Sequence, residues 1–256
     1  MSYVDLHCHL LPGIDDGAAT PADALAHGRR LQAEGVRDVA CTPHVKRGDF
    51  PRVRIAELEA LRRRTQAAFD DAGLLVRLHG GGELSHVDAA WLGEEDLELI
   101  AQGPAHARWL LLECPFEGIG PAFVDAVARL RALGHGLLLA HPERSAGLEE
   151  HGIGALLPWL GDGVALQVNV CSLLGNHGLG VQDTALALLR AGHVHCLASD
   201  GHPGTREHTL QLGYRLLLRA GASSAEAYRL TQENPRWLLE QGVPTLVGPG
   251  LDCLAA

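Results

Sequence analysis

The 256-residue sequence lacks features that would assign it to several large classes of protein. No apolar run approaches the roughly 20 residues that a membrane-spanning helix needs, so no membrane insertion is expected. The first residues show neither a basic segment nor the apolar run of a secretory signal, so the expected location is the cytoplasm. No stripe rich in lysine and arginine offsets the formal net charge of −10. This disfavours nucleic acid as a partner.

The sequence also lacks a disulfide framework and any sign of subdivision. Its six cysteines form no CxxC pair and mostly lie inside apolar runs, where reduced cysteine behaves as a small apolar residue. There is no internal repeat, low-complexity segment or Pro/Ser-rich linker. We therefore expect one domain over residues 1–256, of which about 243–256 form a C-terminal tail. The sequence carries no signal for an oligomeric state.

Short apolar runs alternate with helical stretches along the whole chain. The runs have the near-continuous apolar character of buried parallel strands. The seven predicted strands are Tyr3–His7, Val36–Cys41, Leu74–His79, Trp109–Glu113, Gly136–Ala140, Val164–Val168 and Val194–Ala198. The predicted helices cover residues 21–35, 54–72, 121–133, 152–160, 181–191, 206–220 and 224–231, with a short last helix after Asn234-Pro235. Seven strand–helix units predict an α/β fold, namely a distorted or open (β/α)7 TIM-like barrel. A doubly wound open sheet stays open as the alternative.

Metal-ligating residue types follow the predicted strands. In a βα barrel the carboxyl ends of the strands build the active site. His7 and His9 end the first strand and, being two residues apart, face the same side. Six of the seven strand ends carry His, Asp or Glu. The residues concerned are His7, His9, Asp15, Asp16, His44, Glu83, Glu113, His141, Glu143, Asp200 and His202. Such a set without cysteine suits divalent Mn, Fe or Zn, with positions open for water.

These motifs together resemble the PHP (polymerase and histidinol phosphatase) superfamily, and within it the bacterial CpsB/YwqE-type tyrosine-protein phosphatases. The matching segments are VDLHCHLLPGIDDGA, CTPH, GGEL, LLLECPF, LLAHPER, LQVNVCSLLGNHG, LASDGH and TQENP. They extend over nearly the whole chain in the right order. Three positions depart from the usual pattern, since Val45 follows TPH, Ser145 follows HPER and Pro203 follows SDGH. None of the three departures removes a ligand.

The resemblance implies a distorted (β/α)7 barrel with a trinuclear metal centre. His7, His9, Glu83 and Asp200 are the implied ligands of one ion. Glu83 would bridge to a second ion that Glu113 and His141 also hold. Asp16, His44 and His202 form the implied third set. Arg144 and Arg206 match the phosphate-binding arginines, and the cofactors are two or three divalent ions, with Mn expected first and Fe or Zn as alternatives.

The implied reaction is hydrolysis of a phosphomonoester by metal-activated water. The expected substrate is a phosphotyrosine protein, a bacterial tyrosine kinase with a Tyr-rich tail that takes part in capsule or exopolysaccharide biosynthesis. A small-molecule phosphatase of the histidinol-phosphate type shares the same metals and stays open. A PHP-type phosphodiesterase or nuclease is a further alternative, which the acidic composition disfavours.

The segment Cys41–Arg47 has the C-x5-R spacing of the cysteine-dependent tyrosine phosphatases. That mechanism needs a loop whose backbone N–H groups surround a phosphate and lower the pKa of the cysteine. This loop has no glycine, and Pro43 lacks a backbone donor. We therefore expect Cys41 to have no role in catalysis.

Overall fold

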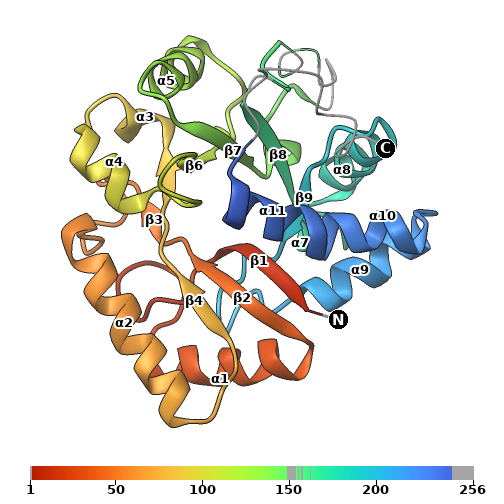
Figure 1. Ribbon diagram of the computed structural model, residues 1–256. Coiled ribbons are helices and arrows are strands. Elements are labelled where there is room, and N and C mark those ends of the chain that lie inside the picture. Colours follow the sequence, from red (N-terminus) through yellow and green to blue (C-terminus); the bar gives the residue numbers. More distant parts are fainter. Residues whose placement is uncertain (1, 149–153, 155, 157, 162, 244–256) are drawn as a thin grey trace.

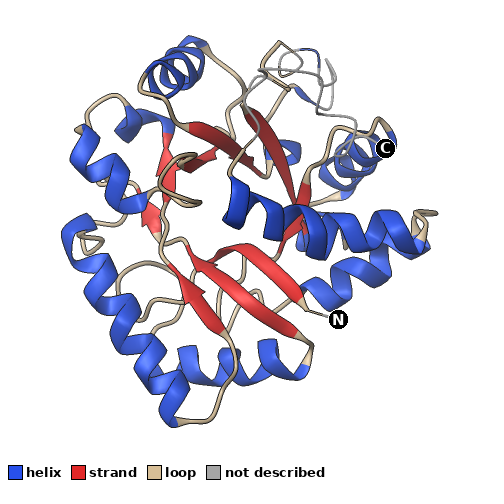
Figure 2. Cartoon of the chain, viewed as in Figure 1, coloured by secondary structure: helices blue, strands red, loops and turns tan. Residues whose placement is uncertain are grey.

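Two parallel sheets form the centre of the molecule, and helices surround them (Figures 1 and 2). The computed structural model describes the chain except residues 1, 149–153, 155, 157, 162 and 244–256. One sheet has the order β1-β2-β4, and the other has the order β3-β5-β6-β7-β8-β9. Every paired neighbour in both sheets is parallel. The α/β class with parallel strands is therefore confirmed.

A strand occurs within or across each of the seven predicted runs. The strands are β1 (Tyr3–Cys8), β2 (Val36–Cys41), β3 (His44–Val45), β4 (Arg77–His79), β5 (Glu83–Ser85), β6 (Trp109–Glu113), β7 (Gly136–Ala140), β8 (Val164–Asn169) and β9 (Cys196–Ala198). The prediction missed β3 and β5, because strands this short show no periodic pattern. These two strands carry His44 and Glu83 into the larger sheet, where the two residues are paired in register.

The helices agree less closely with the prediction. They are α1 (Pro21–Ala33), α2 (Ile55–Asp71), α3 (His86–Ala89), α4 (Glu94–Ile100), α5 (Pro121–Ala132), α7 (Val170–Leu173), α8 (Leu179–Arg190), α9 (Leu210–Arg219), α10 (Ser224–Tyr228) and α11 (Asn234–Gln241), with a 3-10 turn η1 (Pro142–Arg144) and a π-helical turn η3 (Arg229–Glu233). The predicted helix over 152–160 includes residues outside the described part of the chain. The predicted tail lies outside it except for Val243.

The prediction that a helix begins at Arg206 is wrong, because α9 begins only at Leu210. The backbone N–H of His202 donates to the carbonyl of Arg206, and that of Arg206 donates to the carbonyl of His202. This reciprocal pair closes a turn that is incompatible with a helical start. Arg206 therefore lies in the loop after β9, beside the strand ends.

Two apolar clusters fill the molecule. The larger lies between the strands and the outer helices. The smaller contains Val4 of β1, Trp109 of β6 and Leu238 of α11, so residues of both sheets share it. The indole N–H of Trp109 donates to the carbonyl of Leu238 at 2.8 Å, which ties α11 to this cluster. Apolar side chains thus occupy the amino-terminal part of the strands, and the polar ones collect at the carboxyl ends.

The first and last strands meet at the HCH segment. The backbone N–H of Asp200 donates to the carbonyl of His7 at 2.9 Å, and that of His9 donates to the carbonyl of Gly201 at 2.8 Å. The pairing of β1 with β2 shifts between Asp5 and Cys8, and such irregularities change the direction of side chains. Cys8 lies between the two histidines in the sequence and packs in the larger apolar cluster, because successive residues of a strand point to opposite faces.

Within the described residues, no helix combines the length and the apolar character that crossing a membrane requires.

Candidate metal centre

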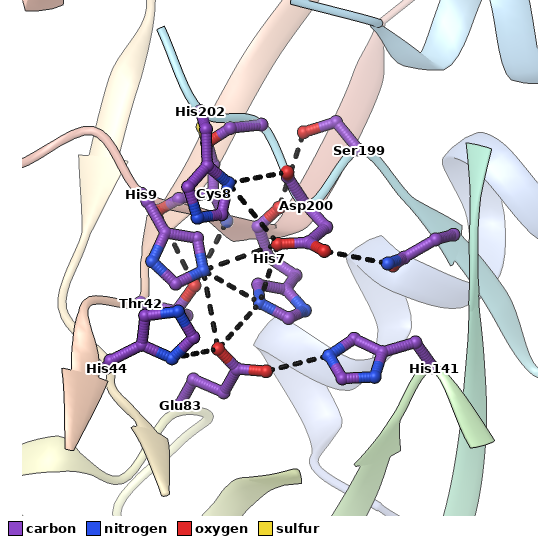
Figure 3. A network of polar contacts seen from close by, with 12 residues as sticks. His7, Cys8, His9, Thr42, His44, Glu83, His141, Ser199, Asp200 and His202 are labelled. Atoms are coloured by element: carbon purple, nitrogen blue, oxygen red, sulfur yellow. Dashed lines mark hydrogen bonds and ion pairs between the residues drawn. The ribbon is translucent and has the colours of Figure 1, made fainter. Parts of the chain in front are cut away.

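All nine predicted metal ligands lie together, at or after the ends of β1, β2, β4, β6, β7 and β9. Figure 3 shows His7, His9, His44, Glu83, His141, Asp200 and His202 of this set. They form four overlapping groups, namely His7, His9 and Asp200; His7, Glu83 and His141; His44, Glu83 and Glu113; and His9, Asp16, His44 and His202. The groups differ in part from the implied sets, since His9 also joins the third set and Glu113 lies with His44 rather than with His141. The proximity of the nine residues is a property of the structure, and their assignment as ligands stays a prediction.

In their neutral tautomers, His7 and His9 direct unprotonated nitrogen atoms at each other. The Nδ1 atom of His9 lies 2.9 Å from a carboxylate oxygen of Asp15, which can only accept, so this nitrogen carries the proton. The Nδ1 atom of His7 lies 3.1 Å from Oε1 of Gln167. The two Nε2 atoms lie 3.1 Å apart. In the neutral rings both atoms would carry only lone pairs, so a proton or a metal cation between them would relieve their repulsion.

Two buried amides determine the orientation of His7. The Asp200 carboxylate accepts from Nδ2 of Asn169 at 2.8 Å, which places the amide oxygen of Asn169 on the other side. That oxygen accepts from Nε2 of Gln167 at 2.6 Å. Oε1 of Gln167 therefore faces His7 and accepts its Nδ1 proton. This relay leaves Nε2 of His7 free to bind an ion, as outer partners of ligating histidines commonly do.

The spacing of four donor atoms fits one shared ion. Nε2 of His7 and Nε2 of His9 each lie 3.4 Å from Oε2 of Glu83, and lie 3.5 and 3.4 Å from Oδ1 of Asp200. Two atoms bound to one ion at about 2.1 Å are roughly 3.0 to 3.4 Å apart in octahedral or tetrahedral geometry. Oε2 of Glu83 is buried and lies 2.8 Å from Nδ1 of His44, but it has no partner with hydrogen-bond geometry. The residues therefore fit a metal ion.

Asp16 joins a second pair of histidines. Its Oδ1 lies 3.3 Å from Nε2 of His44 and 3.1 Å from Nε2 of His202. Burial opposes ionisation of Asp16, but the two histidines outweigh it and hold the pKa of Asp16 well below its usual range. Burial would likewise lower the pKa of His44, but Glu83 and Asp16 raise it to about 9. The carboxylates of Asp16 and Glu83 therefore favour positive charge beside His44.

Glu83 and Glu113 are two carboxylates of one group. Burial, together with the charge of Glu83, raises the pKa of Glu113 to about 7. Like charges this close are stable only with a proton or a cation between them. Glu83 also accepts from Nε2 of His141 if that nitrogen is protonated, at 2.8 Å from Oε1.

Two candidate ligands have an unusual backbone. His141 and Asp200 have φ values of 37° and 48°, and among the described residues they are the two with positive φ that are not glycine. A bulky residue in this region costs free energy, and such strain concentrates at functional sites. This backbone conformation turns both side chains toward the cluster from the ends of β7 and β9.

Both predicted phosphate-binding arginines lie against Asp200. Nη1 of Arg144 lies 3.4 Å from Oδ2 of Asp200, and Nη2 of Arg206 lies 3.1 Å from Oδ1. They line a cavity of about 200 Å³ that Asp16, His44, Glu113, His141 and Asp200 also line. Two partly exposed guanidinium groups beside the histidines and carboxylates suit an anionic group that reaches the cluster from solvent.

Cys41 lies outside this cavity and is buried in β2. Burial raises the pKa of the Cys41 thiol to about 12, so the reactive thiolate is absent at neutral pH. The structure thus agrees with the expectation that the C-x5-R spacing is without catalytic meaning.

Sequence reasoning missed Gln167 and two aromatic residues of the cavity, Phe50 and Phe116. One signal for Gln167 was available. A polar residue within the apolar run VALQVN, two residues before Asn169, faces the same side of the strand. No comparable signal marks the two phenylalanines.

Comparison with known proteins agrees with this geometry. Residues 3–240 match the model of a family described as capsular polysaccharide synthesis, CpsB/CapC. The chain belongs to the CpsB/CapC family. The tyrosine-protein phosphatase YwqE of Bacillus subtilis is 29% identical over 245 residues, covering 92% of this chain and 91% of YwqE. CapC of Staphylococcus aureus is 28% identical and covers 94% of this chain and 95% of CapC.

Solved structures of the CpsB/CapC family have the same fold. A chain from the crystal structures of YwqE from B. subtilis and CpsB from Streptococcus pneumoniae, described as metal-dependent tyrosine phosphatases, superposes with a TM-score of 0.79 at 25% identity and covers 96% of both chains. A phosphotriesterase homology protein from Escherichia coli shares the fold more distantly, with a TM-score of 0.56 at 15% identity.

Proposed function

We propose that this member of the CpsB/CapC family is a metal-dependent tyrosine-protein phosphatase. The observation that carries the proposal is the pair of bare histidine nitrogens of His7 and His9, which face two carboxylates beside two arginines in one cavity. The similarity to YwqE extends over nearly the full length of both proteins and supports the same activity here.

Each group of residues has a distinct task in this proposal. Three ions would be held by His7, His9, Glu83 and Asp200; by Glu83, Glu113 and His141; and by Asp16, His44 and His202. Bound divalent ions would supply Lewis-acid stabilisation of the phosphate and an acidic water as the nucleophile. Asp15 and Gln167 hold the imidazoles in the tautomer that binds metal. Mn is the ion we propose first, because carboxylate ligands suit it, and Fe or Zn, which imidazole suits, are the alternatives.

The two arginines bind and orient the substrate phosphate. Their guanidinium groups approach Asp200 from the cavity side, so a phosphate beside this carboxylate would meet N–H donors of Arg144 and Arg206. Such donors become more effective as charge develops on the transferring group. A phenolate is a good leaving group, so the departing tyrosine needs little help from an acid.

We further propose a distorted seven-unit barrel as a single domain. The hydrogen bonds between the ends of β1 and β9, and the apolar cluster shared by both sheets, support closure. The proposed partner is a bacterial tyrosine kinase with a Tyr-rich tail, and the proposed location of this protein is the cytoplasm.

The test measures hydrolysis of three substrates with each of several metals. The protein is stripped with a chelator, reloaded with Mn, Fe or Zn, and given a phosphotyrosine peptide, histidinol phosphate and DNA ends. We expect turnover of the peptide with at least one metal. Activity on histidinol phosphate alone would replace the proposal by a small-molecule phosphatase. Failure on all three substrates with bound metal confirmed would exclude a phosphoesterase.

Two variants separate metal binding from phosphate binding in the same assay. Asp200→Ala should lose metal and abolish turnover while circular dichroism shows a retained fold. Arg144→Ala should keep its metal content and lose roughly 100-fold or more in kcat/KM. An unchanged rate for Arg144→Ala would remove its proposed role.

A further inference from the structure

Two of the four phenylalanines of this chain line the cavity of the metal centre. Aromatic residues make up only 4% of the sequence, so this concentration is unusual. Phe50 and Phe116 are also the two purely apolar side chains of the cavity wall, whose other members are charged or histidine. Phe116 is 41% exposed, although a ring of this size is usually buried.

Each ring is fixed next to the polar part of the cavity. Phe50 stacks on His44, with ring centroids 4.5 Å apart and an angle of 9° between the planes. Its backbone N–H donates to the carbonyl of Lys46 at 2.9 Å, and an ion pair of Lys46 with Asp49 at 2.7 Å closes the same turn. Phe50 is thus held at the cavity by its own loop and by the ring beneath it.

Phe116 is held in a similar way on another loop. The guanidinium carbon of Arg144 lies 4.5 Å from the centre of its ring, and the His141 ring lies 5.8 Å away. The hydroxyl of Ser145 donates to the carbonyl of Pro115 at 2.6 Å, and the N–H of Ala146 donates to the carbonyl of Phe116 at 2.9 Å. Ser145, one of the departures from the family pattern, therefore anchors this loop.

We propose that Phe50 and Phe116 form a subsite for the phenyl ring of an aryl phosphate and so determine the preference for phosphotyrosine over alkyl phosphates. The inference rests on the proposed function, which places the phosphate at the arginines and the histidines. A group attached to that phosphate must lie along the remaining wall of the cavity, where the two rings are. Aromatic rings attract one another beyond the burial of apolar area, whereas phosphoserine has no ring to stack on either phenylalanine.

The test measures binding of two phosphonates that differ in the ring, so it does not depend on turnover. Dissociation constants of phenylphosphonate and methylphosphonate are measured by titration calorimetry on the metal-loaded protein. We expect the wild type to prefer phenylphosphonate. Phe50→Leu and Phe116→Leu should each reduce that preference roughly threefold to tenfold, as expected for loss of one aromatic pair. KM for a phosphotyrosine peptide should rise by a similar factor.

The ratio of the two constants separates recognition of the ring from a structural effect. If the substitutions only disturbed Arg144 or His44, both phosphonates would lose affinity equally and the ratio would stay constant, which would overturn the proposal. A wild type that binds both equally would also overturn it. Trp91→Leu is the matched control, because Trp91 is 80% exposed and does not line the cavity. If the metal-loaded wild type does not hydrolyse phosphotyrosine, the proposed function itself is refuted.

Discussion

The metal centre depends on which nitrogen of each buried histidine carries the proton. An imidazole binds metal only through an unprotonated nitrogen, and here fixed acceptors take the opposite side of the ring. Asp15 does this for His9, and Gln167 does it for His7. Gln167 is uncharged, yet the chain of amides from Asp200 determines its orientation. A residue remote from any substrate can therefore control metal affinity.

We expect Gln167→Leu to weaken metal binding by about 10- to 100-fold, as measured for other partners of ligating histidines. Leucine retains the apolar volume but removes the acceptor for Nδ1 of His7, so the ring loses its preferred tautomer. Metal affinity is measured by competition with a chelator, and Gln241→Ala, an exposed change at the end of α11, is the control. Unaltered affinity in Gln167→Leu would show that the relay has no role.

At the scale of elements, short loops and helix starts hold the strand ends in place. Gly17, in the loop that carries Asp15 and Asp16, packs so closely on His9 that an added Cβ would lie 2.0 Å from the carbonyl oxygen of His9. A side chain cannot be accommodated there, which explains the glycine of the DDG segment. The same loop leads into α1, whose first turn is fixed by a capping box of Thr20 and Asp23.

Thr20→Ala should lower the free energy of unfolding by about 1 kcal/mol, the usual cost of removing an N-cap side chain. The hydroxyl of Thr20 accepts from the N–H of Asp23, so this donor would keep only the Thr20 carbonyl, at 3.1 Å, and the capping box would be lost. Denaturant unfolding of the metal-free protein measures the change. Ser223→Ala removes the capping box of α10 and should have a similar cost. Thr20→Ala should leave the rate of the metal-loaded enzyme within twofold, and a larger loss would show that the cap also positions Asp16.

For the whole molecule, the centre concentrates ionisable groups in the interior of an acidic protein. His7, His9, Glu83, His141 and Asp200 are all buried. The pKa of His44 at about 9 and that of Glu113 at about 7 both lie above the ordinary values of 6.5 and 4.5. Without metal, these two groups bind more protons in the folded protein than in the unfolded chain. The stability that they contribute therefore falls as pH rises from 4.5 to about 7 at Glu113 and from 6.5 to about 9 at His44.

Metal binding should reverse this dependence, because the ligands must release their protons. The Tm increase caused by Mn should grow from pH 6 to pH 9, and binding at pH 7.5 should release protons. Calorimetry in buffers of different ionisation enthalpy counts those protons. Glu113→Gln should remove the part of the pH dependence of the Tm increase that lies below pH 7. A proton count of zero in the wild type would contradict the pKa values given for the metal-free centre.

The amino-acid sequence by itself determined which strand each candidate ligand follows. Parallel strands end at one edge, so residues placed after consecutive apolar runs must meet there, however far apart they lie in the chain. His7, His44, Glu83 and Asp200 could be assigned to the centre on this ground. The family motifs added Arg144 and Arg206, and the structure places both beside Asp200.

Only the tertiary structure decided how these residues divide into groups and what holds them. His7 and Gln167 are 160 positions apart, and no local pattern predicts that a histidine will face this amide. Helix α9 begins later than predicted because backbone groups of His202 and Arg206 hydrogen-bond to each other in the loop, which overrides the helical periodicity. Phe50 and Phe116 come from separate loops, and their shared cavity exists only once β3 and β6 lie in one sheet.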